Sequence, residues 1–138
     1  MAGKLDLTVA NNLGIDQGET YRLFISYALP PSDDEPQEPI DITGCEARMQ
    51  VREKYGSPVL VELTTEEGGG IVLVGEEGKI NITISDVQTD AMGARAGSTR
   101  PRTEAVYDLE LVFPSGDVQR VVQGVIEIDP NITREVTP

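Results

Sequence analysis

The side chains of this sequence that could take part in chemistry are mostly carboxylates. The 138 residues include 24 aspartates and glutamates, one cysteine and no histidine, so the commonest general base and the commonest zinc ligand are both missing. Hydrolysis by two carboxylates would require a pair of them held in one cleft, and the sequence singles out no such pair. We therefore expect no catalytic residue, no metal site and no cofactor, and we predict that the protein is not an enzyme.

The densest acidic run, Asp33-Asp34-Glu35, lies in a stretch that holds four prolines and four acids, residues 30–39. The run lacks the spaced oxygen ligands and the turn glycine of a calcium-binding loop. The prolines also keep this stretch out of the interior of a sheet. We expect a solvated, extended insertion between two strands, and the sharper alternative is a docking loop for a basic partner.

A second loop is expected at residues 94–102, where three of the eleven bases fall within eight residues of an otherwise acidic chain. A solvated loop is the plain interpretation, but a local positive patch is also what complementarity between subunits would use. The candidate residues for a partner interface are therefore Asp33, Asp34, Glu35, Arg95, Arg100 and Arg102.

The overall charge and composition disfavour several classes of partner. A formal net charge of −13 repels nucleic-acid phosphates and anionic membranes, so we expect neither as a direct partner. The N-terminus shows no cationic flank followed by an apolar segment, and no apolar run approaches the roughly 20 residues of a membrane span, so we expect neither a signal peptide nor a membrane anchor. Two Phe, four Tyr and no Trp disfavour a carbohydrate-binding platform.

The elements that position these residues are predicted from an alternation of apolar and polar residues with period two, the period of a β-strand. This alternation is clearest at residues 45–52, where Cys45 is expected to be a small core residue. Turn-forming residues separate the runs, as in Pro114-Ser115-Gly116-Asp117, and Gly124 inside the last run predicts a bulge or a close backbone approach. The predicted strands cover residues 5–9, 21–27, 45–52, 59–63, 71–74, 80–84, 107–113 and 118–128.

This pattern predicts an all-β fold, an antiparallel β-sandwich of about seven to nine strands. Residues 85–96 break the alternation, and we expect a short helical turn near 86–93, capped by Ser85 or Asp86, that crosses between the sheets. The whole chain, 1–138, is predicted to form one domain, with residues 134–138 as a short tail.

The order of short motifs resembles a group of small tailed-phage virion proteins, and it is similar to the N-terminal domain of the upper baseplate proteins of phages that infect lactic acid bacteria. The resemblance covers roughly residues 15–134. The motifs that carry it are Asp41-Ile42-Thr43-Gly44, Arg48-Met49-Gln50-Val51-Arg52, Leu63-Thr64-Thr65, Gly69-Gly70-Ile71-Val72-Leu73, residues 78–85, Tyr107-Asp108-Leu109-Glu110-Leu111, residues 116–124, Asp129-Pro130 and Ile132-Thr133-Arg134.

The resemblance implies an immunoglobulin-like sandwich that serves as a structural protein of a bacteriophage virion. Such a protein would be an adaptor or anchoring subunit of the tail, neck or baseplate, present in several copies that bind other virion proteins and assembled in the cytoplasm of a bacterial host. The sequence lacks the long C-terminal extension of the upper baseplate proteins, so a stand-alone subunit fits its length better. A capsid-decorating subunit and a carbohydrate- or receptor-binding module are the alternatives. Contact through the two charged loops and addition of a strand to a sheet edge are both open as modes of binding.

Overall fold

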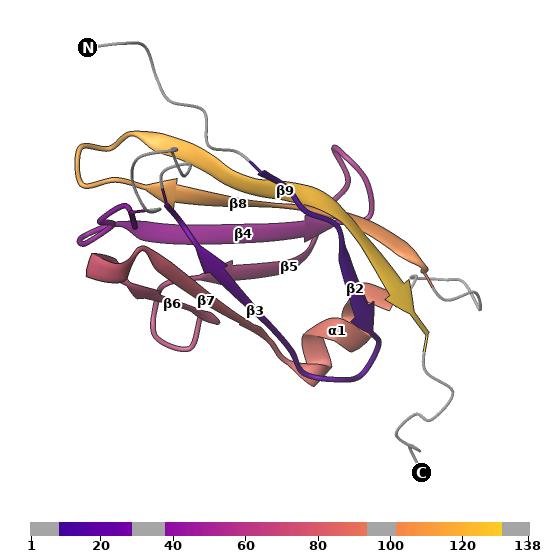
Figure 1. Cartoon of the computed structure of the whole chain (residues 1–138). Coiled ribbons are helices and arrows are strands. Elements are labelled where there is room, and N and C mark those ends of the chain that lie inside the picture. Colours follow the sequence, from indigo (N-terminus) through magenta and orange to yellow (C-terminus); the bar gives the residue numbers. More distant parts are fainter. Residues whose placement is uncertain (1–8, 29–37, 94–101, 131–138) are drawn as a thin grey trace, which may run out of the picture.

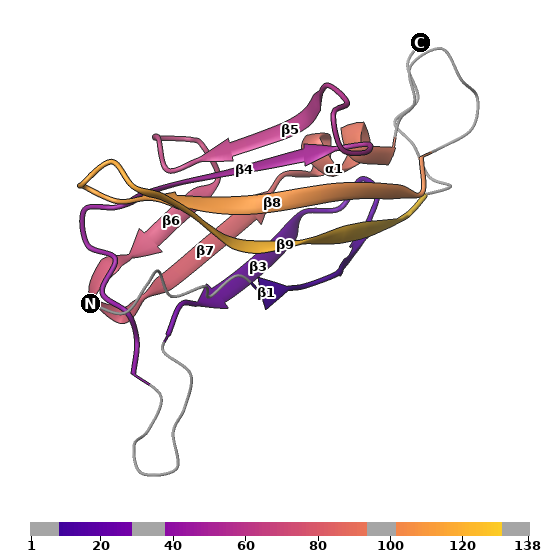
Figure 2. The ribbon, with the colours of Figure 1, turned by 90° about the horizontal axis from the view of Figure 1, so that it is seen from above.

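Two β-sheets packed against each other form the part of the chain that the structure describes (Figures 1 and 2). The structure is a computed structural model, and it describes residues 9–28, 38–93 and 102–130. The larger sheet consists of β1 (Val9–Ala10), β2 (Leu13–Asp16), β4 (Glu46–Arg52), β5 (Val59–Thr64), β8 (Glu104–Val112) and β9 (Val118–Asp129). The smaller sheet consists of β3 (Tyr21–Ser26), β6 (Ile71–Val74) and β7 (Lys79–Ile84).

The strand order confirms the predicted all-β sandwich and gives it an immunoglobulin-like topology. The larger sheet runs β1-β9-β8-β4-β5, with β2 also paired to β9, and the smaller sheet runs β3-β7-β6. The orders β3-β7-β6 and β9-β8-β4 correspond to strands BED and GFC of an immunoglobulin domain, with β5 added beside β4, but β1 and β2 lie on the sheet of β9 instead of on that of β3. One detail differs from the antiparallel prediction, because β1 and β2 pair with β9 in parallel. A parallel pair needs a long connection between its strands, and nearly the whole domain lies between these.

The alternation in the sequence becomes a buried and an exposed side of each strand. In β8, Ala105, Tyr107, Leu109 and Leu111 are buried, while the residues between them are only partly buried. They pack with a core contributed by both sheets and the segments that join them. The other large and fully buried side chains of this core include those of Met49, Leu63, Ile80, Ile82, Ile84, Met92 and Ile126.

A short helix, α1 (Asp86–Gly93), connects β7 to β8 and confirms the helical turn predicted near residues 86–93. Ser85 caps it, because its Oγ accepts a hydrogen bond from the amide of Gln88 (3.2 Å) and its own amide donates to Oε1 of Gln88 (3.0 Å). This reciprocal pair is a capping box. The helix lies near β2 (Figure 1), and the side chain of Gln17 donates to the carbonyl of Asp90 (3.1 Å). These contacts fix the crossover between the two sheets. A 3₁₀ turn, Gly75–Glu77, joins β6 to β7.

Gly124 in β9 allows the close backbone approach that the sequence predicted. The segment between β1 and β2 passes directly over it, and an added Cβ would lie 2.7 Å from the carbonyl carbon of Asn11 and closer still to its oxygen. Tyr107, the cross-strand partner of Gly124, donates its hydroxyl to that same carbonyl (2.5 Å). Asn12 also accepts a hydrogen bond from the amide of Val125 (3.1 Å). The glycine therefore lets β1 and β2 dock on β9.

Candidate protein-interaction surfaces

The structure describes only one of the six residues predicted to form a partner interface. Asp33, Asp34, Glu35, Arg95 and Arg100 lie outside the described residues. Arg102 is described, and the prediction that it belongs to a solvated, positively charged loop is wrong, because the residue is only 6% exposed.

Arg102 is buried because it completes the end of helix α1. Its backbone amide donates to the carbonyl of Gly93 (2.6 Å), and its guanidinium donates to the carbonyl of Met92 (2.6 Å). The last carbonyls of a helix have no partner inside the helix and carry a partial negative charge, so a cation is favoured there. Glu53 adds a carboxylate 4.0 Å from the guanidinium. The charge of Arg102 thus serves the fold and does not form part of the outer surface.

The outer face of the smaller sheet combines exposed apolar side chains with basic ones. Phe24 is 70% exposed and Val72 is 64% exposed, and both are cross-strand partners of Asn81 in β7. Arg22 and Lys79 supply the charge, and none of the three strands contains an aspartate or glutamate. We call this surface the acid-free face, and its outward residues are Arg22, Phe24, Ser26, Val72, Val74, Lys79, Asn81 and Thr83.

The acid-free face is unusual on a protein with a net charge of −13. Single exposed apolar residues are ordinary, but Phe24 and Val72 lie in one row on either side of Asn81, and the exposed Val74 lies beside Val72 on β6. Several exposed apolar side chains gathered on one face mark interaction sites. This surface was not predicted from the sequence. The sequence does contain two indications of it. Phe24 occupies a position on the polar side of its strand, and residues 21–27 and 71–84 contain no acid apart from Glu76 and Glu77. Recognising it required knowledge that β3, β7 and β6 are neighbours.

The outer face of the larger sheet carries paired charges instead. Arg48 contacts Glu110 (2.9 Å between Nε and Oε1), and Arg120 lies 3.4 Å from Asp108. Burial and the neighbouring Glu110 raise the pKa of Asp108. These side chains line a shallow hollow of about 1090 Å³, whose other polar and aromatic residues include Gln50, Arg52, Tyr55, Glu62 and Gln123.

One corner of that same outer face is strongly acidic. Glu104 and Glu127 are direct cross-strand partners, and so are Asp16 and Asp129. All four are exposed, and like charges directly opposite each other destabilise a sheet. Next to them, Val106 and Val125 form a half-buried apolar pair. We call these four carboxylates the acidic corner.

Crowding of carboxylates at this end of the molecule extends to the turn after β2. A hydrogen bond with Asp16, and then the charge of Asp16, raises the pKa of the exposed Glu19. The fold therefore keeps several negative charges close together at a cost to its own stability. This is the expected pattern where a partner supplies the compensating positive charge.

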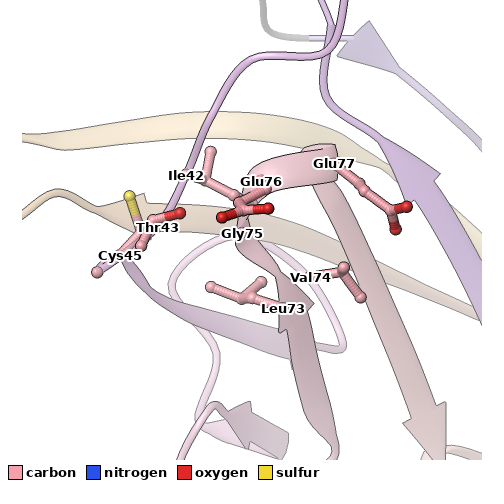
Figure 3. Close-up of a pocket in the computed structure, with 9 residues that line it drawn as sticks. Ile42, Thr43, Cys45, Leu73, Val74, Gly75, Glu76 and Glu77 are labelled. Atoms are coloured by element: carbon pink, nitrogen blue, oxygen red, sulfur yellow. The ribbon is translucent and has the colours of Figure 1, made fainter.

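A second hollow, of about 730 Å³, lies where the chain enters β4 beside the turn after β6 (Figure 3). Cys45 is half-buried there, and burial together with the charge of Asp41 raises the pKa of its thiol, so the reactive thiolate is disfavoured. Asp41 accepts hydrogen bonds from the hydroxyl (2.5 Å) and from the amide (2.9 Å) of Thr43, and these lower the pKa of its carboxyl. Cys45 packs against the core, in agreement with the sequence prediction.

No family model and no curated protein matches the sequence. Within residues 9–28, 38–93 and 102–130, no group of three or more Cys, Asp or Glu side chains is arranged so that it could hold a metal ion. The same residues include no helix that is long and apolar enough to cross a membrane.

Proposed function

We propose that this protein is a non-enzymatic structural subunit that binds other proteins within a larger assembly. The observation that carries the proposal is the acid-free face, with Phe24 and Val72 exposed in one row. An aromatic side chain held on a rigid strand and surrounded by small polar residues is a typical anchor of a protein–protein contact. The two bases at its margin would steer an acidic partner surface toward it.

The chemistry of the described hollows supports a non-enzymatic role. In the larger hollow, Asp108 and Glu110 are each engaged by an arginine, and Gln50 donates to Glu62 (2.8 Å). In the smaller one, the thiol of Cys45 is held in its neutral form. The whole sequence contains no histidine that could act as a base beside these groups. Side chains in such mutual contacts are suited to a rigid surface and poorly suited to proton transfer.

The assembly that we propose is a bacteriophage virion. The support is the order of strand and turn motifs in the sequence, which resembles small virion proteins, together with an immunoglobulin-like topology that suits a building block. In this role the chain would be an adaptor or anchoring subunit of the tail, neck or baseplate. Its partners would be other virion proteins, and several copies would be present in one particle.

Mass spectrometry of purified particles tests the virion role, and absence of the chain from them would refute that role. A variant then tests the surface. Phe24→Ser should reduce incorporation about tenfold or more, because loss of an anchor side chain typically weakens an interface by more than about 1.4 kcal/mol. The matched control is Tyr55→Ser, since Tyr55 is 98% exposed but lies in the turn between β4 and β5 of the larger sheet. Equal incorporation of both variants would show that the acid-free face is not the contact.

A second candidate function is a carbohydrate- or receptor-binding module, and the hollow on the larger sheet favours it. Its arginine, glutamine and carboxylate side chains offer donors and acceptors, and the ring of Tyr55 stands at its margin. Saturable binding on a glycan array that is lost in Tyr55→Ala and retained in Phe24→Ser would support this function over the first. A capsid-decorating role is a variant of the first proposal, and a copy number close to that of the major capsid protein would identify it.

A further inference from the structure

We infer that the partner of the acid-free face is the acidic corner of a second copy of this chain, so that copies associate head to tail. The inference deepens the proposed function and rests on it, because it takes the acid-free face to be an interface. It adds the identity of one partner and the residues of the contact. The charges and the apolar character of the two surfaces support it, and their placement and size determine the kind and the strength of the association.

The charges of the two surfaces are complementary. Arg22 and Lys79 are exposed on a sheet whose strands contain no acid, although Lys79 also lies 3.8 Å from Glu77 in the turn between β6 and β7. Glu104, Glu127, Asp16 and Asp129 are exposed together with no base paired to them in the registers of β2, β8 and β9. Each surface alone is unfavourable or unusual for an isolated molecule. When the two surfaces meet, the guanidinium group of Arg22 and the ammonium group of Lys79 would relieve the repulsion between the carboxylates of the acidic corner.

The apolar parts of the two surfaces also correspond. On the acid-free face, Phe24 lies two residues along β3 from Arg22. On the other surface, Val106 and Val125 lie two residues along their strands from Glu104 and Glu127. In both cases, therefore, an apolar group lies about 7 Å from a charged one on the same face of a sheet. A contact could bury Phe24 against the two valines while its rim carries opposite charges.

The placement of the two surfaces determines the kind of assembly. They occupy the outer faces of different sheets, and the outer faces of a sandwich point away from each other (Figure 2). A contact between them joins different patches of two copies and leaves one of each patch free. Such heterologous contacts continue into rings or open chains and do not stop at a dimer.

The size of the contact predicts that one interface is weak. Three strands about 4.8 Å apart and up to six residues long present an area of roughly 15 by 20 Å, well below the roughly 800 Å² per partner of a stable complex. We therefore expect association of the free protein at concentrations near about 0.1–1 mM, and stable rings only where other subunits hold the copies in place.

Sedimentation velocity over a concentration series of the full chain tests this inference. The average mass should rise with concentration at about 20 mM salt and rise less at about 500 mM salt, because screening weakens contacts between exposed charges. Phe24→Ser should reduce the association constant about tenfold. Arg22→Glu should reduce it at least about threefold, as should Glu104→Lys combined with Glu127→Lys.

The decisive sample is the mixture of these two charge-reversed variants. In a head-to-tail contact, the new carboxylate at position 22 of one variant meets the new ammonium groups at positions 104 and 127 of the other. The acid-free face of the second variant and the acidic corner of the first are both unchanged, so they can form the wild-type contact. The mixture should therefore associate as strongly as the wild type, although neither variant does so alone. The matched control is Asp117→Lys, which reverses an exposed charge in the turn between β8 and β9, at the opposite end of these strands from Glu104 and Glu127, and should leave association unaltered.

Three outcomes would overturn the inference: wild-type protein that stays monomeric at low salt, a mixture that associates no better than its components, or a control variant that weakens association equally. Association that is lost with Arg22→Glu but retained when Glu104→Lys and Glu127→Lys are combined would also overturn it, since the contact would then join two acid-free faces. Monomeric protein whose incorporation into particles still depends on Phe24 would refute only this inference. Association of a chain that is absent from particles would refute only the virion role.

Discussion

Replacement of Gly124 by alanine offers a direct test of how the first strands are held on the sandwich. Gly124 lies under the segment that joins β1 to β2, and an added Cβ would be 2.7 Å from the carbonyl carbon of Asn11, where backbone atoms cannot give way without moving the segment. We expect Gly124→Ala to displace Asn11 and Asn12 from β9. The parallel strands β1 and β2 would then lose part of their docking.

The expected loss of stability follows from the contacts that this displacement breaks. The hydroxyl of Tyr107 would lose its acceptor, the carbonyl of Asn11, and the amide of Val125 would lose the side chain of Asn12. Each hydrogen bond contributes about 1 kcal/mol. Overpacking adds about 1–3 kcal/mol, reduced by the modest gain of replacing a strand glycine with alanine. We therefore expect a net decrease of about 2–4 kcal/mol in the free energy of unfolding.

Urea denaturation measures this change, and Gly14→Ala is the matched control. Gly14 lies in β2, has nothing within 4 Å of an added Cβ and does not adopt a positive φ, so alanine should be neutral or should stabilise by up to about 1 kcal/mol. Hydrogen exchange should also locate the damage. In Gly124→Ala, the amides of β2 should exchange faster relative to those of β4, whereas Gly14→Ala should leave their ratio unchanged.

If Gly124→Ala proved as stable as Gly14→Ala, the close approach of Asn11 could not be what requires a glycine at this position. A loss of stability spread evenly over all strands would contradict the local part of the prediction, because it would place the strain in the core and not in the segment above it.

Three further predictions concern single side chains. Burial raises the pKa of Tyr107 to about 12, so the folded state retains the phenol proton to a higher pH than the unfolded chain does. This contributes about 2–3 kcal/mol to the free energy of unfolding below about pH 10, and the contribution should be lost as the pH rises toward 12. Between about pH 9 and 12, the denaturation midpoint should fall less steeply in Tyr107→Phe than in the wild type, and as steeply as in the wild type in Tyr55→Phe. Identical profiles for all three proteins would show that Tyr107 is not the group responsible. Arg102→Met should lower the free energy of unfolding by about 2–4 kcal/mol in urea denaturation, because it leaves buried helix carbonyls without a donor, while Lys54→Met at an exposed turn should change it little. Ser85→Ala removes the capping box of α1 and should cost about 1 kcal/mol in the same assay, and a neutral effect would show that the helix is fixed by its tertiary contacts alone.

Most of the fold could be predicted from the sequence because the strands are half-buried. A strand with one side in the core must alternate, and residues 45–52 and 107–111 do so without interruption, which indicates their inward side. The extent was predicted well for β4, whereas β8 begins three residues before the predicted strand, at Glu104. Ser85 and Gln88 have the spacing of a capping box, so the start of the helix could be read locally as well. Gly124 was informative because glycine within a strand usually marks a close approach.

The features that escaped prediction depend on residues far apart in the chain. β2 has only two apolar residues, Leu13 and Ile15, and its identity as a strand depends on pairing with β9 more than a hundred residues later. Arg102 follows a stretch rich in arginine and glycine that predicts a solvated loop. Its burial arises from the carbonyls at the end of α1, which only the folded chain brings to it.

The candidate surfaces were even less accessible to sequence reasoning. Phe24 and Val72 belong to strands separated by more than forty residues, and the acidic corner draws on β2, β8 and β9. Each contributing segment has an ordinary composition by itself. Only the strand order shows that acids are absent from one outer face and concentrated on part of the other.

The parallel docking of β1 and β2 on β9 has a mechanical consequence. The first described strand enters at Val9, opposite Val122, and the last one leaves at Asp129, opposite Asp16, so the two ends of the domain exit in opposite directions along one pair of strands. A pulling force between them would load the hydrogen bonds of this pair lengthwise and together, instead of opening them one after another. Tension between the two ends would therefore pass along β9, and the resistance of the sandwich to stretching would be governed by the rate at which β1 and β2 slide apart from β9.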